Sequence, residues 1–203
     1  MLKVYHAPNT RSLRVIWLLE EMGLPYEREM VEFTPANLQS PAYLAVHPLG
    51  KVPAIDDDGL ILTESGAIVQ YLLAKHSGSH LTPDIGTPAY GKYLQWLHFA
   101  EATVMPPIGQ IVQHTFRKPK EERLQSVIDE SNATLGRYMT LLDKELANKE
   151  FICGDQFTAA DIMLGYDLNL CKIIRFSLDP YPNVAAYFAR LSARPAFQRA
   201  TAN

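Results

Sequence analysis

The alternation of apolar and polar residues divides the chain into a first part with strand and helix signals and a second part with helical signals only. In the first part we expect a strand at Leu2–His6, a helix within Asn9–Gly23, a strand at Tyr26–Val31, a short helix at Pro35–Val46, strands at Pro53–Ile55 and Leu60–Leu62, and a helix at Thr63–Lys75. The strands follow a period of two, the helices follow a longer period, and Asp58-Gly59 between apolar runs is a hairpin signal. These elements follow one another in the order βαβαββα, which predicts a domain of the α/β class.

Downstream of about residue 77 the composition shifts to Ser, Gly, Thr, Pro and Asp without apolar periodicity, which is typical of a linker. We therefore expect a first domain at residues 1–77, a linker at 78–87 and an all-helical domain at 88–203. The predicted helices of the second domain are Ala89–Gln113, Pro119–Asn148, Thr158–Cys171, Pro182–Leu191 and a short piece at Pro195–Arg199. Thr158 followed three residues later by Asp161 is the pattern of a capping box, to which we assign a structural role only.

Composition and charge narrow the range of functions. The 203 residues are 47% apolar, enough for a real core, and 19 basic side chains are interspersed with 22 acidic ones. No basic patch suggests nucleic acid or an anionic membrane, and no apolar run approaches a membrane span. The N-terminus lacks signal-peptide and transit-peptide character, so we expect a soluble cytoplasmic protein. Cys153 and Cys171 lack metal-ligand spacing, and we expect both to be buried in a reducing compartment, with no metal bound.

The loop Pro8–Ser12 joins the first predicted strand to the first predicted helix. Hydroxyl and amide donors at a helix N-terminus, backed by the positive end of the helix dipole, stabilise a thiolate. The same residues also fit a structural role in which Thr10 or Ser12 caps the helix. The loop therefore predicts a thiolate site or a helix cap.

A second cluster surrounds Val52-Pro53, directly before an apolar strand. A cis peptide bond there would turn the amide and carbonyl of Val52 outward to pair with an extended peptide, whereas a trans proline would only begin the strand. Lys51 precedes this pair and is a cation for a ligand carboxylate, or a solvated surface charge.

A third cluster, Thr63–Ala67, opens the next predicted helix. The Ser65 hydroxyl and the first-turn amides suit a carboxylate and Glu64 suits an ammonium group, although a plain helix cap uses the same residues. Together the clusters offer partners for an amino-acid head group, a central thiol and a second carboxylate. Glutathione has these three features.

Four segments resemble the glutathione S-transferase superfamily in its order and spacing: NTRSLRVIWLLEEMGLPYE, HPLGKVPAIDDDGLILTESGAIVQYL, LHFAEATVMPPI and FICGDQFTAADI. The first loop is most similar to the bacterial and fungal theta-like or nu-like branch with a serine or threonine in this loop. The resemblance implies a thioredoxin-like glutathione-binding domain, a helical domain and a homodimer. It also implies detoxification chemistry that uses glutathione as co-substrate and needs no permanently bound cofactor.

The resemblance also implies roles for single residues. Val52 before a cis Pro53 would pair with the cysteinyl backbone, Glu64 with Ser65 would hold the γ-glutamyl head, and Lys51 would meet the glycine carboxylate. Gln39 or His47 would assist Lys51, and Arg11 is a further glutathione-binding candidate.

For the residue that activates the thiol, the resemblance leaves several positions open. The theta-like catalytic serine falls at Thr10, the cysteine-type residue at Arg11 and the nu-like residue at Asn9. We expect Thr10 to be catalytic, with Asn9, Arg11 and Ser12 as alternatives, and we expect Tyr5, which lies on the strand, to pack in the fold.

The second substrate of such an enzyme is a small hydrophobic electrophile. The residues expected to line its site are Phe99, Thr103, Met105, Pro106, Tyr166 and Phe176. Each of them also suits the core of a helical domain, and His98 and Glu101 suit either a dimer interface or the site. Other functions on the same fold are a glutathione peroxidase, a reductive dehalogenase, a disulfide-bond reductase, or a non-catalytic module that binds glutathione or another ligand.

Overall fold

The computed structural model describes residues 1–76 and 80–202, which form two compact units. The first unit combines the N-terminal residues as far as the 77–79 segment with the described residues from Ala193 onward, and the second is His80–Ser192. The expected boundary at 77 and the start of the expected linker lie outside the described residues. Residues 80–87 belong to the second unit. The described residues from Ala193 onward, which we expected within the helical domain at 88–203, group with the first unit.

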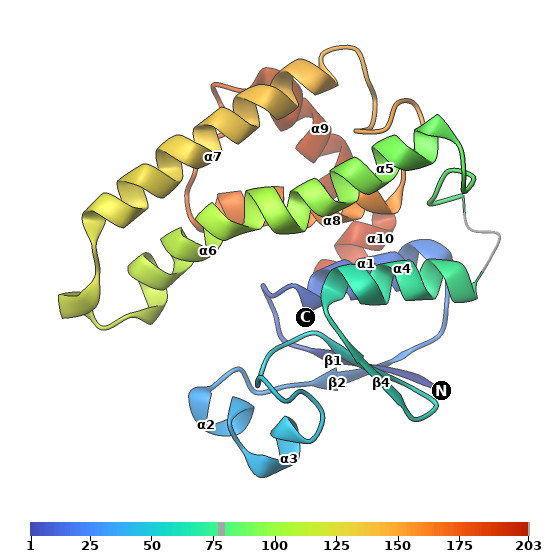
Figure 1. Cartoon of the computed structure of the whole chain (residues 1–203), viewed down its shortest axis with the longest axis vertical. Helices are drawn as coiled ribbons and strands as arrows, with labels where there is room; N and C mark the ends of the chain where they lie inside the picture. The colour runs from blue at the N-terminus through green and yellow to red at the C-terminus, as the bar shows by residue number, and fades with distance from the viewer. Residues whose placement is uncertain (77–79, 203) are drawn as a thin grey trace. The chain divides into compact units, whose positions relative to one another are not determined.

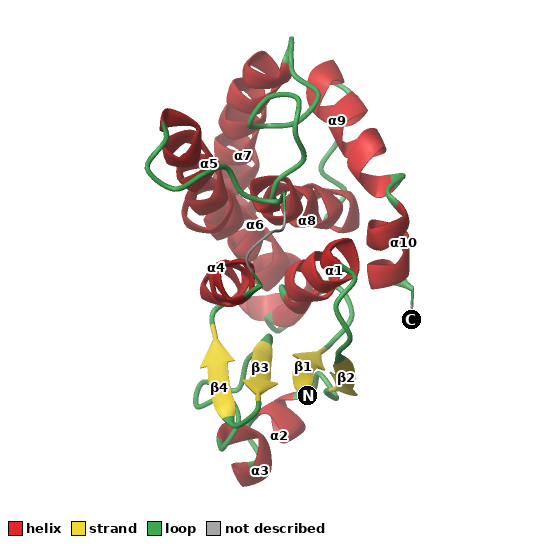
Figure 2. Cartoon of the chain, turned by 90° about the vertical axis from the view of Figure 1, so that its right-hand side faces the viewer, coloured by secondary structure: helices red, strands yellow, loops and turns green. Residues whose placement is uncertain are grey.

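The first unit is a mixed four-stranded sheet in the order β2-β1-β3-β4. Its strands are β1 (Leu2–His6), β2 (Glu27–Met30), β3 (Ala54–Asp57) and β4 (Leu60–Thr63), and its main helices are α1 (Ser12–Met22) and α4 (Ser65–Lys75). Strands β1 and β2 are parallel, whereas β1–β3 and β3–β4 are antiparallel. Figure 2 shows α1 and α4 together on one side of the sheet and the short helices α2 and α3 on the other. The predicted thioredoxin-like order is confirmed.

Local chemistry explains two of the turns in this unit. Asp58 and Gly59 both have positive φ, 52° and 96°, which is the backbone that a tight hairpin turn requires and that Asp-Gly adopts readily. Helix α1 ends at Gly23 with φ 62°, and the Gly23 N–H donates to the carbonyl of Leu19. Both turns had a clear signal in the sequence.

The single helix expected at Pro35–Val46 was wrong. The structure has two short helices, α2 (Pro35–Leu38) and α3 (Pro41–Leu44), with Thr34 and Ser40 as their N-caps. Because a residue before proline avoids the helical region, Ser40 is extended, with ψ 144°, and the helix cannot pass through Pro41.

The second unit is helical throughout. Its elements are α5 (Pro88–Phe99), η1 (Ala100–Val104), α6 (Met105–Val112), η2 (Gln113–Arg117), η3 (Lys120–Glu122), α7 (Gln125–Leu146), α8 (Ala159–Ile173) and α9 (Pro182–Ser192). Figure 1 shows α5 and α6 as one long rod beside α7. The all-helical prediction is confirmed for this unit.

The long helix expected at Ala89–Gln113 contains the π-helical segment η1 and extends to Arg117 through a second one, η2. Pro106 and Pro107 follow η1 and cannot donate backbone hydrogen bonds, so the regular ladder is interrupted where they enter the helix. The helix expected at Pro119–Asn148 begins later, since only a 3₁₀ turn precedes α7.

Helix α8 begins with the predicted capping box. The Thr158 N–H donates to Asp161 Oδ2 at 2.7 Å, and Asp161 also accepts from the Ile152 N–H at 2.9 Å and the Tyr187 hydroxyl at 2.7 Å. Asp161 is fully buried. The carboxylate therefore ties the start of α8 to the loop before it and to α9.

The last helix, α10 (Pro195–Thr201), lies beside α1 in the first unit, as Figures 1 and 2 both show. The Trp17 and Phe197 rings meet edge to face with centroids 4.8 Å apart. Arg194 makes two hydrogen bonds to the Glu21 carboxylate, at 2.6 and 2.8 Å, and Arg199 Nε donates to Glu20 at 2.6 Å. Within residues 1–76 and 80–202, no helix is both long and apolar enough to span a bilayer.

Candidate active site

Strand register brings the three predicted glutathione-binding segments to one edge of the sheet. Tyr5 on β1 pairs with Ala54 on β3, and Ala54 pairs with Thr63 on β4. The chain leaves β1 one residue past Tyr5, after His6, enters β3 at Ala54 and leaves β4 after Thr63. The loop before α1, the segment before β3 and the start of α4 therefore emerge at the same edge.

The loop between β1 and α1 holds a compact set of hydroxyl groups. Thr10 Oγ1 lies 2.7 Å from the Ala7 carbonyl oxygen and 2.7 Å from Ser12 Oγ. Ser12 Oγ lies 2.8 Å from His6 Nδ1. Asn9 is exposed with φ 59°, a conformation that asparagine tolerates better than most residues. Helix α1 has no side-chain cap at Arg11, so its first turn is not closed by the expected N-cap hydroxyl.

A hydrogen bond from α3 fixes the segment before β3. The Tyr43 hydroxyl donates to the Lys51 carbonyl at 2.7 Å, and burial raises the pKa of Tyr43 to about 12, which keeps the phenol protonated. The Val52–Pro53 peptide is cis, as the family resemblance implied. Val52 is buried and the Lys51 side chain is exposed.

Gly50 allows the segment around Lys51 to pass close to α2. Its φ is +59°, and a side chain there would place a Cβ 2.4 Å from the Leu38 carbonyl oxygen and 2.6 Å from Gln39 Nε2. Gln39, one of the two expected helpers of Lys51, therefore lies next to the Gly50 backbone. The other expected helper, His47, is buried and its Nδ1 accepts from the Leu49 N–H at 3.3 Å, so that nitrogen supports the loop itself.

At the start of α4, Glu64 is exposed and Ser65 is buried. Glu64 has φ 68° and ψ 107°, a conformation that is unfavourable for a side-chain-bearing residue and that is found preferentially at functional sites. Arg14 Nη1 donates to Ser65 Oγ at 3.1 Å from the buried first turn of α1. A buried guanidinium behind a hydroxyl and a helix N-terminus favours a bound carboxylate.

Sequence reasoning missed Arg14, His6 and Tyr43. Arg14 stands within an otherwise apolar buried run of α1, and a charge in such a run indicates a specific partner. His6 is two residues after buried Val4, so the strand period places it on the buried face. Nothing local indicates that Tyr43 reaches Lys51.

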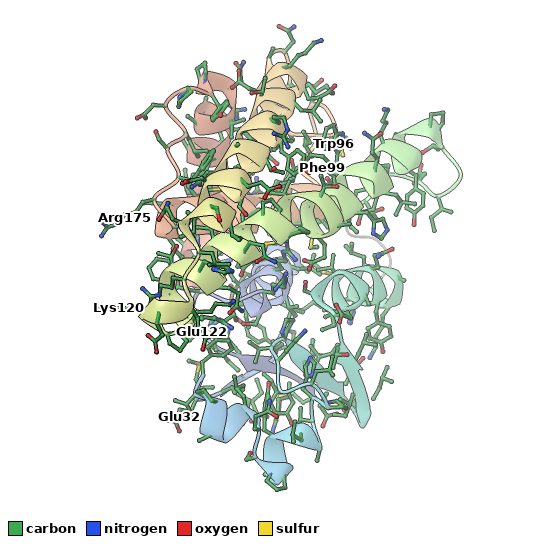
Figure 3. All side chains as sticks on the ribbon, turned by 60° about the vertical axis from the view of Figure 1, so that its left-hand side comes forward. Glu32, Trp96, Phe99, Lys120, Glu122 and Arg175 are labelled. Carbon is green, nitrogen blue, oxygen red and sulfur yellow. The ribbon has the colours of Figure 1, made fainter. Side chains whose placement is uncertain are left out.

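The predicted electrophile-site residues lie in the helical unit. Met105 and Tyr166 are buried, whereas Phe99, Thr103 and Phe176 are half-buried and Pro106 is exposed. Phe99 packs edge to face on Trp96, with centroids 5.2 Å apart (Figure 3), and also on Tyr138. Phe176 stacks on Tyr181 at 6.2 Å. Their assignment to an electrophile site stays a prediction.

Across the part of the chain that the structure describes, no group of three or more His, Cys, Asp or Glu side chains is arranged to hold a metal ion. Burial raises the pKa of the Cys153 thiol to about 11 and raises that of Cys171 further, so both are thiols at neutral pH.

Comparison with known proteins decides the family. Residues 1–74 match the model of the glutathione S-transferase N-terminal domain, and residues 104–195 match that of the C-terminal domain. The chain belongs to the glutathione S-transferase family. Glutathione S-transferase 3 of Schizosaccharomyces pombe is 31% identical over 97% of this chain and 85% of its own length.

Two further family relatives bear on function. The disulfide-bond oxidoreductase YfcG of Escherichia coli is 30% identical over 97% of this chain and 92% of its own length. A glutathione transferase family member from Pseudomonas fluorescens, solved with two glutathione bound, is 31% identical with a TM-score of 0.89. That alignment covers 98% of this chain and 92% of the solved one. The family and the fold expected from the sequence are confirmed.

Proposed function

We propose that this glutathione S-transferase family member is an enzyme that binds glutathione at the sheet edge of its first unit and activates it as a thiolate. The observation that carries the proposal is the register of Tyr5, Ala54 and Thr63. Through it, a hydroxyl cluster, a segment suited to pair with an extended peptide, and a carboxylate site backed by Arg14 face one edge. These are the partners that a γ-glutamyl-cysteinyl-glycine peptide requires.

In this proposal the γ-glutamyl head lies at the start of α4. Ser65 and the first amides of α4 bind its carboxylate, and Glu64 binds its ammonium group. The backbone of Val52 pairs with the cysteinyl residue as a short β-augmentation. Lys51, with Gln39 beside it, binds the glycine carboxylate. Arg11, half-buried at the start of α1, is a further contact.

Thr10 is the proposed activating residue, with Ser12 and Asn9 as alternatives. A free thiol with a pKa of about 8.5 is roughly 3% ionised at pH 7, and a decrease of about two units multiplies the thiolate fraction roughly 20- to 30-fold. A hydrogen bond to a charged group contributes about 1.5–3 kcal/mol, which is the size needed. The thiolate then forms a C–S bond to the electrophile, and the leaving group departs with the bonding electrons.

Several parts of the proposal are supported by membership of the glutathione S-transferase family and not by a contact in the structure. They are the homodimer, the cytoplasmic location with a detoxification role, and a hydrophobic electrophile site that uses Phe99, Thr103, Met105, Tyr166 and Phe176. The two free cysteines agree with a reducing compartment. Replacing Phe99 by Ala should raise the KM for the electrophile and leave that for glutathione unchanged.

A second function on the same site is disulfide-bond reduction, favoured by the similarity to YfcG. Such a reaction needs no pair of protein cysteines, because two glutathione molecules supply both thiols and leave as glutathione disulfide. The high pKa values of Cys153 and Cys171 agree with a reaction in which neither acts as a nucleophile.

The test measures glutathione binding by calorimetry and turnover of an aryl halide, an organic hydroperoxide and a mixed disulfide side by side. The proposal expects binding, with the aryl halide as a substrate. Ser65→Ala should weaken glutathione binding by about tenfold or more, because it removes one hydrogen bond to a carboxylate.

Ser126→Ala is the matched control, since Ser126 is an exposed serine in the first turn of α7. It should leave binding unchanged. Wild-type protein that binds no glutathione would overturn the proposal, and turnover of the mixed disulfide alone would replace transferase activity with the second function.

A further inference from the structure

The hydroxyl cluster before α1 extends inward to a histidine. His6 is the last residue of β1 and is 5% exposed, Ser12 is the first residue of α1 and is 0% exposed, and Thr10 is 9% exposed. The chain of contacts runs from His6 Nδ1 to Ser12 Oγ at 2.8 Å and from Ser12 Oγ to Thr10 Oγ1 at 2.7 Å. Thr10 is the member nearest to the surface.

The positions of the protons in this chain follow from counting donors. The Ala7 carbonyl oxygen can only accept, so the hydroxyl proton of Thr10 lies on the 2.7 Å contact between them. Thr10 then has no proton for Ser12, and the 2.7 Å contact between the two hydroxyls must be donated by Ser12. Ser12 has one proton, which leaves none for His6.

His6 must therefore donate from Nδ1. Ser12 Oγ also lies 3.2 Å from the Ala7 carbonyl oxygen and 3.3 Å from the Ala7 N–H. If the Ser12 proton is shared with that carbonyl, it is still not available to His6. Each of the three contacts of 2.7–2.8 Å, namely Thr10–Ala7, Thr10–Ser12 and His6–Ser12, needs one proton. All three have one only if His6 carries a proton on Nδ1.

We propose that His6 is a positioning residue: it donates from Nδ1 to Ser12 and directs the Ser12 proton to Thr10. The Thr10 proton is then not needed by Ser12, and it can leave the Ala7 carbonyl oxygen for the sulfur of glutathione when glutathione binds. This inference rests on the proposed function. The opposite ring tautomer would accept the Ser12 proton, Ser12 would accept that of Thr10, and Thr10 would have no proton for a thiolate. The tautomer of a buried ring thus decides whether Thr10 acts as a donor.

Electrostatics support a single proton on the ring. Burial, with a smaller contribution from Arg28, lowers the pKa of His6 to about 4, so the imidazole is neutral in the range where a transferase works. A neutral ring has one donor and one acceptor nitrogen, so its hydrogen-bond partner fixes which is which.

The other two buried histidines provide an internal contrast. His114 Nδ1 accepts from the Leu124 N–H at 3.0 Å, and His47 Nδ1 accepts from the Leu49 N–H at 3.3 Å. When neutral, both must carry their proton on Nε2.

The first test is ring ¹⁵N NMR of the unmodified protein at neutral pH. It should find His6 with its proton on Nδ1, and His47 and His114 with theirs on Nε2. An Nε2–H tautomer for His6 would overturn the proposal. This readout does not depend on glutathione, so it separates a wrong relay from a wrong function.

The second test compares variants by the pKa of enzyme-bound glutathione, followed by the ultraviolet absorbance of the thiolate. His6→Phe should raise that pKa by about one unit, which is about tenfold in the ionisation equilibrium, with little change in KM for glutathione. His6→Asn offers an amide donor close to the Nδ1 position and should recover most of the loss. Ser12→Ala breaks the same relay if His6→Phe does not fold.

The matched control is His114→Phe, which replaces an equally buried histidine in the helical unit. It should lower stability without moving the thiol pKa. An unchanged thiol pKa in both His6→Phe and Ser12→Ala would overturn the proposal. If the wild-type protein bound no glutathione, the proposed function and the role of Thr10 would both fail, even with the Nδ1–H tautomer present.

Discussion

A buried polar network in each of the two units can be compared, and the two networks end on different acceptors. In the first unit, a chain of hydrogen bonds runs from His6 through Ser12 to Thr10, and its last acceptor is the neutral carbonyl oxygen of Ala7. In the helical unit, the Ile152 N–H, the Thr158 N–H and the Tyr187 hydroxyl converge on the buried carboxylate of Asp161.

The difference lies in what a ligand can replace. A neutral carbonyl oxygen that loses its donor to a stronger acceptor such as a thiolate costs about 1–3 kcal/mol, which a charge-assisted hydrogen bond to the thiolate can offset. A buried carboxylate that lost its donors would leave an uncompensated charge, which costs far more. The His6–Ser12–Thr10 network, whose last proton can move to a ligand, is therefore suited to catalysis. The network around the Asp161 carboxylate is suited to stabilising the fold.

The largest predicted effect tests the closed network. Asp161→Asn should lower the free energy of unfolding by about 3 kcal/mol or more, because an amide group can no longer accept from every donor around it. Urea unfolding followed by circular dichroism measures the loss. Asp155→Asn, an exposed neighbour in the same loop region, is the control and should change stability little. A loss no larger than that of the control would remove the contrast.

The next effect concerns pH. Because the folded pKa of His6 is about 4 and its ordinary value is 6.5, the folded state binds fewer protons than the unfolded state between these values. The contribution of His6 to stability is fully present above pH 6.5 and is lost as pH falls toward 4. The slope attributable to this group is at most about 1.4 kcal/mol per pH unit.

Unfolding measured from pH 7 to pH 4 in wild type and His6→Asn tests this prediction. The variant lacks the titrating ring, so its stability should fall less steeply over that range. Parallel curves for the two proteins would mean that His6 does not take up its proton in this window.

The smallest effect compares two threonines, each hydrogen-bonded in its own network. Thr10→Val should lower kcat/KM about tenfold or more near neutral pH with little loss of stability, since it removes the proposed thiolate donor. Thr158→Val should instead cost about 1 kcal/mol of stability as a lost helix cap and leave kcat/KM unchanged. Steady-state kinetics and thermal unfolding of both variants separate the roles. Equal kinetic effects would contradict the distinction between the networks.

The parts of the fold that the sequence predicted are those with local causes. The Asp58-Gly59 hairpin, the Gly23 helix end and the Thr158 capping box each depend on a few neighbouring residues. The break at Pro41 was also local but was overlooked, because the apolar pattern of Pro35–Val46 was given more weight than the residue before proline.

The residues of the candidate site also separate into those with a local signal in the sequence and those without one. Candidate residues near turns and helix starts, such as Thr10, Val52 and Ser65, could be proposed from their motifs and from the family resemblance. The Arg14–Ser65 hydrogen bond joins positions 51 apart in sequence, and the direction of the His6 relay depends on distances that exist only after β1 and α1 pack. Sequence periodicity gives the face of a residue, but not the partner that it meets there.

The return of α10 to the first unit has a consequence for evolution and for engineering. Topologically, the helical unit is an insertion between two segments of the first unit. A recombination event with a single crossover at residues 80–87 would replace α10 along with the helical unit. In the hybrid, Trp17 and Glu21 of the first unit would then face a last helix from another protein in place of Phe197 and Arg194. Exchange of the helical unit alone therefore requires a second crossover near Ala193.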